Sequence, residues 1–260
     1  MSQAIELPVL DAADRDALAE LLLAVADDEF VIGFWDSEWT GIAPMLEEDV
    51  ATSSIAQDEI GHAKALYELL ATLTDDDADR IAFGRDAADF RHAALLNHAR
   101  GDWAFSVARR YLYETADAVR LAALAASSYE PLASLAGKIR REETYHQLHG
   151  EAWLRRLAES TDAGRDRLVS GLECLWTDAQ EVFAPLEGES RLLERRILAK
   201  PMQAMHAEWQ TQVRDRLRPI CAELPDASPT PDGRRRRTDD FRWLHGEFTS
   251  VARSEETATW

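Results

Sequence analysis

Two copies of a Glu-x-x-His motif constrain the fold of this 260-residue chain more than any other feature of its sequence. The first copy pairs Glu59 with His62, and the second pairs Glu143 with His146. Residues three apart in a helix lie one turn apart on the same face, so each copy presents a carboxylate beside an imidazole. One such motif is a weak signal, because both residue types are common on surfaces. Two copies on two long amphipathic segments are typical of a carboxylate-bridged di-metal site inside a four-helix bundle.

The rest of the chain is helical in pattern, and no alternating run of β-branched residues indicates a strand. Hydrophobic residues make up 46% of the sequence, which is enough for a sizeable core. Asp102 is expected to cap one helix, and Pro131 to lie in the first turn of the next. The periodicity predicts long helices over about 14–35, 45–73, 102–127, 129–160, 165–183, 190–217 (broken near Pro201) and 239–253.

Two segments lack this regular pattern. Residues 78–97 are expected to form short helices and loop, and residues 219–238, which hold four of the nine prolines, are expected to form a loop. We therefore predict an all-α protein with a single domain over 1–260. Its bundle core covers about 14–160, and its C-terminal helices and loop cover about 165–260.

A di-metal site also needs one lone carboxylate on the helix that precedes each motif. Glu29 lies on the apolar stripe of the first helix, and Glu114 lies on that of the third. Glu29 and Glu59 are 30 residues apart, and Glu114 and Glu143 are 29 residues apart. Such matched spacing is expected of two halves related by a pseudo-twofold axis. The candidate ligands are therefore Glu29, Glu59, His62, Glu114, Glu143 and His146.

These residue types suit ferrous or manganous ions. Carboxylate oxygens are hard ligands, and one imidazole per metal suits iron or manganese equally. Four carboxylates roughly neutralise two divalent cations, so the whole cluster can be buried. Without metal the four carboxylates would repel one another, and each buried unpaired charge would be costly. The ligand set does not distinguish the two metals, and we expect a di-iron site, with manganese as the alternative.

Some assignments near this set stay open in the sequence. Glu142 is an alternative to Glu143, which we favour because it repeats the Glu59–His62 spacing. Asp117 is either an acceptor that orients a ligand histidine or an exposed acid. Three tyrosines lie near the proposed ligands in sequence and are interpreted as packing residues rather than redox residues: Tyr67, Tyr113 and Tyr145.

The formal charge of −19 disfavours sequence-independent nucleic-acid binding, which needs a basic face. The four consecutive arginines at 234–237 are a local exception. We interpret them as a solvated loop or a partner contact in preference to a phosphate site. Residues 1–10 lack the pattern of a signal peptide, and no stretch is apolar enough to predict a membrane span. Two cysteines without metal-type spacing favour a reducing compartment, so we expect a cytoplasmic protein.

Four stretches resemble the phenylacetic acid catabolic protein family, and within it the PaaC-type subunits of phenylacetyl-CoA epoxygenase (ring 1,2-epoxidase). They are residues 36–44 (DSEWTGIAP), 55–63 (IAQDEIGHA), 110–114 (RYLYE) and 141–146 (REETYH). The C-terminal pattern is similar too, with a basic loop, a short helix and a closing Trp260. The resemblance covers nearly the whole chain.

This resemblance implies a ferritin-like helical bundle and a place in an oxygenase complex. It implies that the partner is a homologous catalytic A-type subunit, with small accessory subunits and a separate reductase that delivers electrons from NADPH. The complex would epoxidise the ring of phenylacetyl-CoA. In some family members the C-type subunit has eroded metal ligands, whereas all six positions here hold residues able to bind metal.

Three functions therefore stay open at the level of sequence. The first is a C-type subunit that itself holds a di-metal site. The second is a purely structural scaffold subunit that supports the homologous catalytic partner. The third is a stand-alone ferritin-like oxidase or metal-storage protein.

Overall fold

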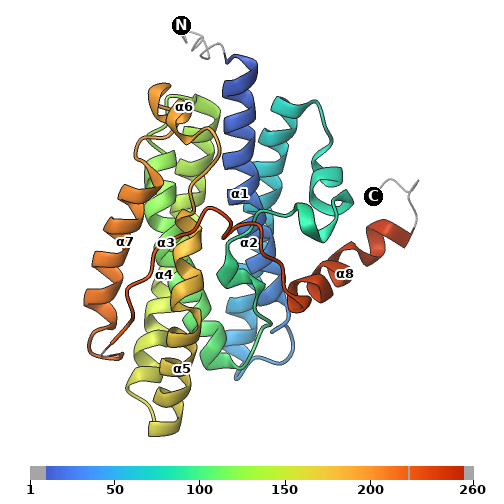
Figure 1. Ribbon diagram of the computed structural model, residues 1–260. Helices are drawn as coiled ribbons and strands as arrows, with labels where there is room; N and C mark the ends of the chain where they lie inside the picture. Colours follow the sequence, from blue (N-terminus) through green and yellow to red (C-terminus); the bar gives the residue numbers. More distant parts are fainter. Residues whose placement is uncertain (1–9, 222, 255–260) are drawn as a thin grey trace, which may run out of the picture.

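The computed structural model describes residues 10–221 and 223–254, so the expectations for residues 1–9 and for Trp260 lie outside the described residues. Within these ranges every regular element is helical and no strand occurs, which confirms the all-α prediction (Figure 1). The helices are α1 (Ala12–Ser37), α2 (Leu46–Thr74), α3 (Trp103–Leu124), α4 (Glu130–Ala158), α5 (Asp162–Ala179), α6 (Glu189–Glu194), α7 (Met202–Leu217) and α8 (Asp239–Ser254).

The ends of the helices follow local chemistry. The Asp102 side chain accepts a hydrogen bond from the backbone N–H of Phe105 at 2.9 Å, which confirms it as the N-cap of α3. Pro131 lies in the first turn of α4, as expected. The predicted sixth helix is divided into α6 and α7, with Pro201 directly before α7. Residues 80–97 hold one π-helical and two 3₁₀ turns, in agreement with the mixed pattern of that segment.

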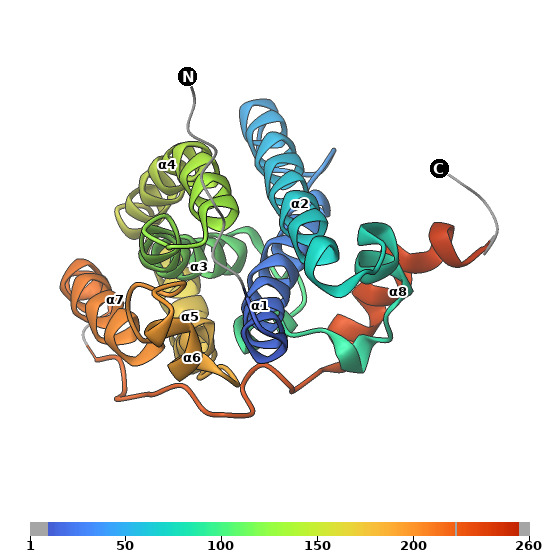
Figure 2. The same ribbon diagram turned by 90° about the horizontal axis from the view of Figure 1, so that it is seen from above.

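The first four long helices pack as two antiparallel pairs, α1 with α2 and α3 with α4, as in a ferritin-like bundle (Figures 1 and 2). Helix α1 lies at the centre of the molecule and is buried on nearly every side, since α6 and α8 also pack against it. Most of its buried residues are aliphatic or aromatic, but Asp27, Asp28, Glu29 and Asp36 are buried too. With Asp14, the central helix has five buried acids, and such a helix needs positive charge from its neighbours.

The C-terminal region covers one side of the bundle. Helices α5 and α7 pack on α3, where the buried rings of Trp176 and Trp209 stack with centroids 5.5 Å apart. The long loop after α7 then passes outside α1 and leads to α8, which lies beside the turns of residues 80–89 (Figure 2). Among the described residues, no helix is long and apolar enough to cross a membrane.

Candidate metal centre

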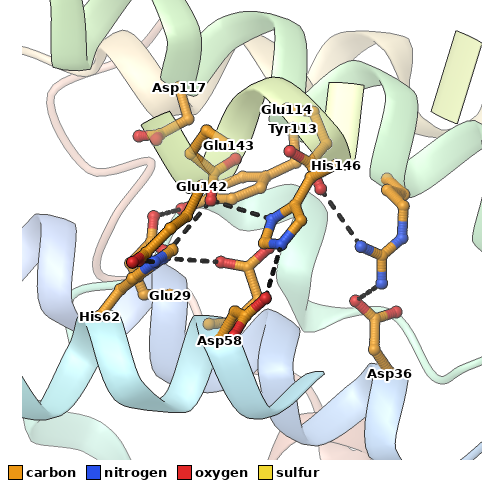
Figure 3. Close-up of polar contacts among 12 residues, drawn as sticks. Glu29, Asp36, Asp58, His62, Tyr113, Glu114, Asp117, Glu142, Glu143 and His146 are labelled. Carbon is orange, nitrogen blue, oxygen red and sulfur yellow. Dashed lines mark hydrogen bonds and ion pairs between the residues drawn. The ribbon is translucent and has the colours of Figure 1, made fainter. Parts of the chain in front are cut away.

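The six carboxylates and imidazoles singled out in the sequence meet between the two helix pairs (Figure 3). Their ligand atoms form two groups, and within each group all the atoms lie within 4.8 Å of one another. One group holds Glu29 and His62, the other holds Glu114 and His146, and both include Glu59 and Glu143. All six side chains are buried. Such a grouping would suit two adjacent cations that share Glu59 and Glu143.

A glycine on α1 lets the first helix pair come close at this point. A Cβ atom on Gly33 would lie 2.8 Å from a side-chain carbon of Ile60 and 3.0 Å from Cβ of Glu59. Only a residue without a side chain therefore permits this approach of α1 to α2. Since Gly33 lies one turn after Glu29, the contact sets the separation of Glu29 from Glu59. No pattern in the sequence indicated this role of Gly33.

Both histidines direct one ring nitrogen into the cluster. Nδ1 of His62 lies 3.2 Å from Glu29 and 3.4 Å from Glu143. Nδ1 of His146 lies 3.0 Å from Glu143 and 3.3 Å from Glu59. Each imidazole is therefore placed to offer Nδ1 to a metal ion shared with these carboxylates.

The outer nitrogen of each histidine meets a carboxylate from the opposite motif. Nε2 of His62 lies 2.8 Å from Glu142, and Nε2 of His146 lies 3.3 Å from Asp58. These two carboxylates are 44% and 45% exposed, at the outer side of the cluster (Figure 3). Such partners fix the orientation and tautomer of a ligating imidazole. Glu143 thus lies in the cluster and Glu142 outside it.

Asp58 and Glu142 were not recognised as histidine partners in the sequence, although a signal was present. Each stands directly before the glutamate of a Glu-x-x-His motif. Asp117, which the sequence offered as an acceptor that orients a ligand histidine, has a different role. It is neither an exposed acid nor a histidine partner, because it is buried and forms an ion pair with Arg120.

The pKa values of several side chains in the cluster are strongly shifted from their ordinary values. Burial raises the pKa of Glu29 well above its usual value, and the nearby Glu59 carboxylate raises it further. Burial and the nearby Glu143 raise the pKa of Glu114 in the same way. For His146, burial opposes protonation, but the contacts with Glu143 and Glu59 dominate and raise the pKa to about 10. The metal-free cluster thus favours a protonated His146, and a metal ion would have to displace that proton.

Unsatisfied polar atoms converge on the cluster. Both carboxylate oxygens of Glu59 and both of Glu143 lack a hydrogen-bond partner among the described residues, as do one oxygen of Glu114 and Nδ1 of His146. Buried polar atoms without partners are rare in folded proteins and need an explanation. Here six of them belong to one cluster whose donor set suits a hard divalent cation. The residues present therefore fit a di-metal centre.

A second set of buried acids surrounds this cluster, and each of them pairs with an arginine. Asp27 pairs with Arg85, Asp36 with Arg110, Asp117 with Arg120, and Asp28 with both Arg120 and Arg234. We call these four aspartates and four arginines the outer ring. Their charges compensate one another within the protein.

The environment of Arg234 contradicts the interpretation of the four arginines at 234–237 as a solvated loop or a partner contact. Its guanidinium is buried, lies 3.0 Å from Asp28, and donates to the backbone carbonyl oxygens of Val182 and Arg91. It is therefore neither solvated nor free for a partner, and it ties the C-terminal loop to α1. Arg235 and Arg236 are exposed, as expected for a solvated loop.

The three tyrosines take different places. Tyr113 donates a hydrogen bond to Glu29 at 2.6 Å and so touches a candidate ligand. Tyr67 donates to Asp27 in the outer ring. Tyr145 is exposed. Of these three, Tyr67 and Tyr113 are buried, and both add a hydrogen bond to their packing role.

Comparison with known proteins identifies the relatives of this chain. A family model described as phenylacetic acid catabolic protein matches residues 3–260. The C-type subunit of 1,2-phenylacetyl-CoA epoxidase from Escherichia coli (strain K12) is 29% identical over 197 residues, which cover 75% of this chain and 79% of that protein. The A-type subunit of the same epoxidase is 27% identical over 223 residues, which cover 85% of this chain and 71% of that protein.

Proposed function

Because the chain belongs to the phenylacetic acid catabolic protein family, we propose that it is the C-type subunit of a multicomponent oxygenase that epoxidises the ring of phenylacetyl-CoA. The C-type assignment is supported by the similarity to the C-type relative, since the match covers a larger share of that protein than of the A-type relative. Because the A-type relative is also similar, an A-type subunit of related fold is the proposed partner. Electrons would come from NADPH through a separate reductase, with small accessory subunits completing the complex.

We propose further that the six clustered residues hold two metal ions, iron in preference to manganese. The observation that carries this proposal is the convergence of unpartnered buried oxygens of Glu59 and Glu143 between the two histidines. When bound, a di-iron pair supplies reductive activation of molecular oxygen.

The protein's own part in this function is to hold and orient ligands. Glu59 and Glu143, which belong to both ligand groups, would be shared by the two ions, and Glu29 and Glu114 would each bind one of them. Asp58 and Glu142 accept from the outer nitrogens and keep the inner nitrogens directed at the site. Burial of all six ligands excludes bulk water from the cluster.

Three large apolar side chains exposed on α2 and α4, two helices that contact each other, support the proposal of a protein partner. Leu46 and Val50 on α2 are 74% and 63% exposed, and Leu148 on α4 is 62% exposed. Large apolar side chains exposed on neighbouring helices are typical of interaction sites. We assign this surface to the A-type partner.

A scaffold subunit is the second candidate function. It is favoured by the hydrogen bond from Arg110 to Glu114, which gives one candidate ligand a partner within the protein. Under this reading the chain stabilises its A-type partner, and its own metal ions are dispensable.

Metal analysis of the purified chain tests the site. We expect about two iron or manganese ions per chain, and loss of both in Glu59→Gln and Glu143→Gln, which remove one bridging carboxylate each. Glu151→Gln is the matched control, because Glu151 is an exposed carboxylate on the same helix as Glu143. A metal content that is unchanged in both bridging variants would contradict the proposed site.

Turnover of phenylacetyl-CoA by the assembled complex separates the first two functions. If the site in this chain takes part in the chemistry, Glu143→Gln abolishes epoxide formation while the complex still assembles. If the chain is a scaffold, Glu143→Gln complexes keep their activity. Purification of the chain without any homologous subunit would favour a stand-alone oxidase or storage protein.

A further inference from the structure

The two proposed metal positions have different neighbours. At the first position Glu29 accepts a hydrogen bond from the neutral hydroxyl of Tyr113 at 2.6 Å. Its only ion-pair partner among the described residues is the ligand His62. No arginine or lysine of residues 10–221 and 223–254 therefore forms an ion pair with the carboxylate that closes this position.

At the second position the corresponding donor is a cation. The guanidinium of Arg110 donates to Oε1 of Glu114 at 3.2 Å. Arg110 and Glu114 stand four residues apart on α3, so the pair lies on one helix face. Within the described part of the chain, Arg110 is the one arginine that pairs with a candidate ligand.

The side chain of Arg110 is fixed in its position by burial and by its neighbours. Its side chain is only 6% exposed, and its far side forms an ion pair with the buried Asp36. Trp39, Trp103 and Trp153 line a small space beside it, together with Asp36, and leave little room for another rotamer. Moving the guanidinium away from Glu114 would break a buried ion pair, which is costly.

We infer that the chain binds its two metal ions unequally, tightly at the position of Glu29 and His62, and weakly at the position of Glu114 and His146. The inference rests on the proposed di-metal site and deepens it. Arg110 occupies Oε1 of Glu114, which leaves only Oε2 for a metal ion, and it places a positive charge beside that ion. Tyr113 only donates a neutral hydrogen bond to Glu29 and leaves the carboxylate charge available. Arg110 is thus a positioning residue that sets the order in which the site fills.

Titration of the full metal-free chain with Mn²⁺ alone tests this order without measuring turnover. Calorimetry is expected to resolve two binding steps that differ by about tenfold or more in affinity. Electron paramagnetic resonance of the same samples should show the six-line signal of isolated Mn²⁺ at one equivalent. The second equivalent should replace that signal with the broadened signal of a coupled pair.

Two isosteric variants assign the steps to positions. Glu114→Gln is expected to remove the weak step and to leave the tight step and the isolated signal. Glu29→Gln is expected to remove the tight step. The opposite assignment, or a single step in which both ions enter without an isolated signal, would overturn the inference while the proposed site stands. Absence of any Mn²⁺ binding to the wild-type chain would overturn the site itself, and the inference with it.

The role of Arg110 is tested by neutralising it together with its partner. The double substitution Arg110→Gln with Asp36→Asn removes both charges of a buried pair, so it avoids leaving an unpaired aspartate. The glutamine amide can still donate to Glu114, just as Tyr113 donates to Glu29. We expect the weak step to tighten about tenfold and the isolated signal at one equivalent to diminish. Unchanged separation of the two steps in the folded double variant would refute the role of Arg110.

Discussion

Asp28 and Glu29 are consecutive residues of α1 and both are completely buried, but their carboxylates have opposite electrostatic environments. Asp28 faces the outer ring, where Arg120 and Arg234 compensate it. Glu29 faces the metal cluster, where its ionic partner is a histidine and the nearest charges are other carboxylates. A single residue step along α1, a rotation of about 100°, therefore separates a carboxylate whose charge is compensated within the protein from one whose charge is not.

This difference indicates separate roles for the outer ring and the metal cluster. A buried ion pair that is complete within the chain holds helices and loops in place. A buried carboxylate without a cation costs stability, and the cost is recovered when a cation binds. The outer ring is thus structural, and the inner cluster is arranged for ligands that come from outside the chain.

Breaking the outer ring is expected to have the largest effect. Asp28→Ala leaves Arg120 and Arg234 buried without their shared partner, and should lower the free energy of unfolding by about 3–5 kcal/mol with or without metal. Chemical denaturation of the metal-free chain measures this loss. The exposed Asp239→Ala serves as control and should change stability by less than about 0.5 kcal/mol. A loss at Asp28 no larger than at Asp239 would contradict the structural role.

The effect of Asp28 also has a defined pH dependence. Burial favours the neutral acid, but Arg234 and Arg120 outweigh it and hold the pKa of Asp28 below its ordinary value. A depressed carboxylate pKa contributes stability above the unfolded pKa of about 3.9, and this contribution is lost as the pH falls through the lower folded pKa. The stability difference between wild type and Asp28→Ala should therefore be constant from pH 7 to about 5 and shrink only in stronger acid.

Replacing Glu29, the residue after Asp28, with a neutral residue should increase the stability of the metal-free chain, whereas Asp28→Ala should decrease it. Glu29→Gln removes a buried carboxylate that lies among others, so we expect the metal-free chain to be stabilised by about 1 kcal/mol. The same change should weaken metal binding at least about 100-fold, or about 2.7 kcal/mol, because a ligand is lost. Denaturation and metal titration of one preparation measure both. Destabilisation of the metal-free chain would show that Glu29 belongs with the outer ring.

The close approach of α1 to α2 at Gly33 positions the metal cluster, and disturbing it should have a smaller effect. Gly33→Ala places a Cβ atom 2.8 Å from Ile60 and should cost about 1–3 kcal/mol of stability while displacing Glu59. Gly137→Ala on α4 is the matched control, since nothing lies within 4 Å of its added Cβ. That control should stabilise the chain by about 0.5–1 kcal/mol. Equal effects at both glycines would mean that the close approach has no importance.

The smallest effect is expected from substitution of Asp58 and Glu142, the carboxylates that contact Nε2 of the two histidines. Asp58→Ala removes the partner of Nε2 of His146 and should weaken metal binding about tenfold, or about 1.4 kcal/mol, with little change in stability because Asp58 is half exposed. Glu142→Ala should act in the same way through His62. Calorimetric titration measures both. Unchanged affinity in the two variants would show that the histidines are oriented by packing alone.

Much of the fold could be predicted from periodicity. The bounds of the long helices agree with the structure within a few residues because helix ends depend on local chemistry, such as the Asp102 cap and Pro201. The placement of Glu29 and Glu114 inside the bundle followed from their positions on apolar stripes. The interpretation of Arg234 was wrong for the converse reason, because its partner Asp28 lies 206 positions away and periodicity does not reveal it. The interpretation of Asp117 was wrong although its partner Arg120 stands three residues later on the same helix, a spacing that the sequence shows.

The sequence by itself determined the helices, the faces that they bury and the composition of the six-residue cluster, because each of these depends on spacing within one helix. Only the tertiary structure decided which buried acids are compensated and which are not. That distinction depends largely on which arginine reaches which carboxylate across the bundle, as Arg234 and Arg120 reach Asp28 and as Arg110 reaches Asp36. An ion pair needs its two groups within a few ångströms, and packing between elements alone sets that distance.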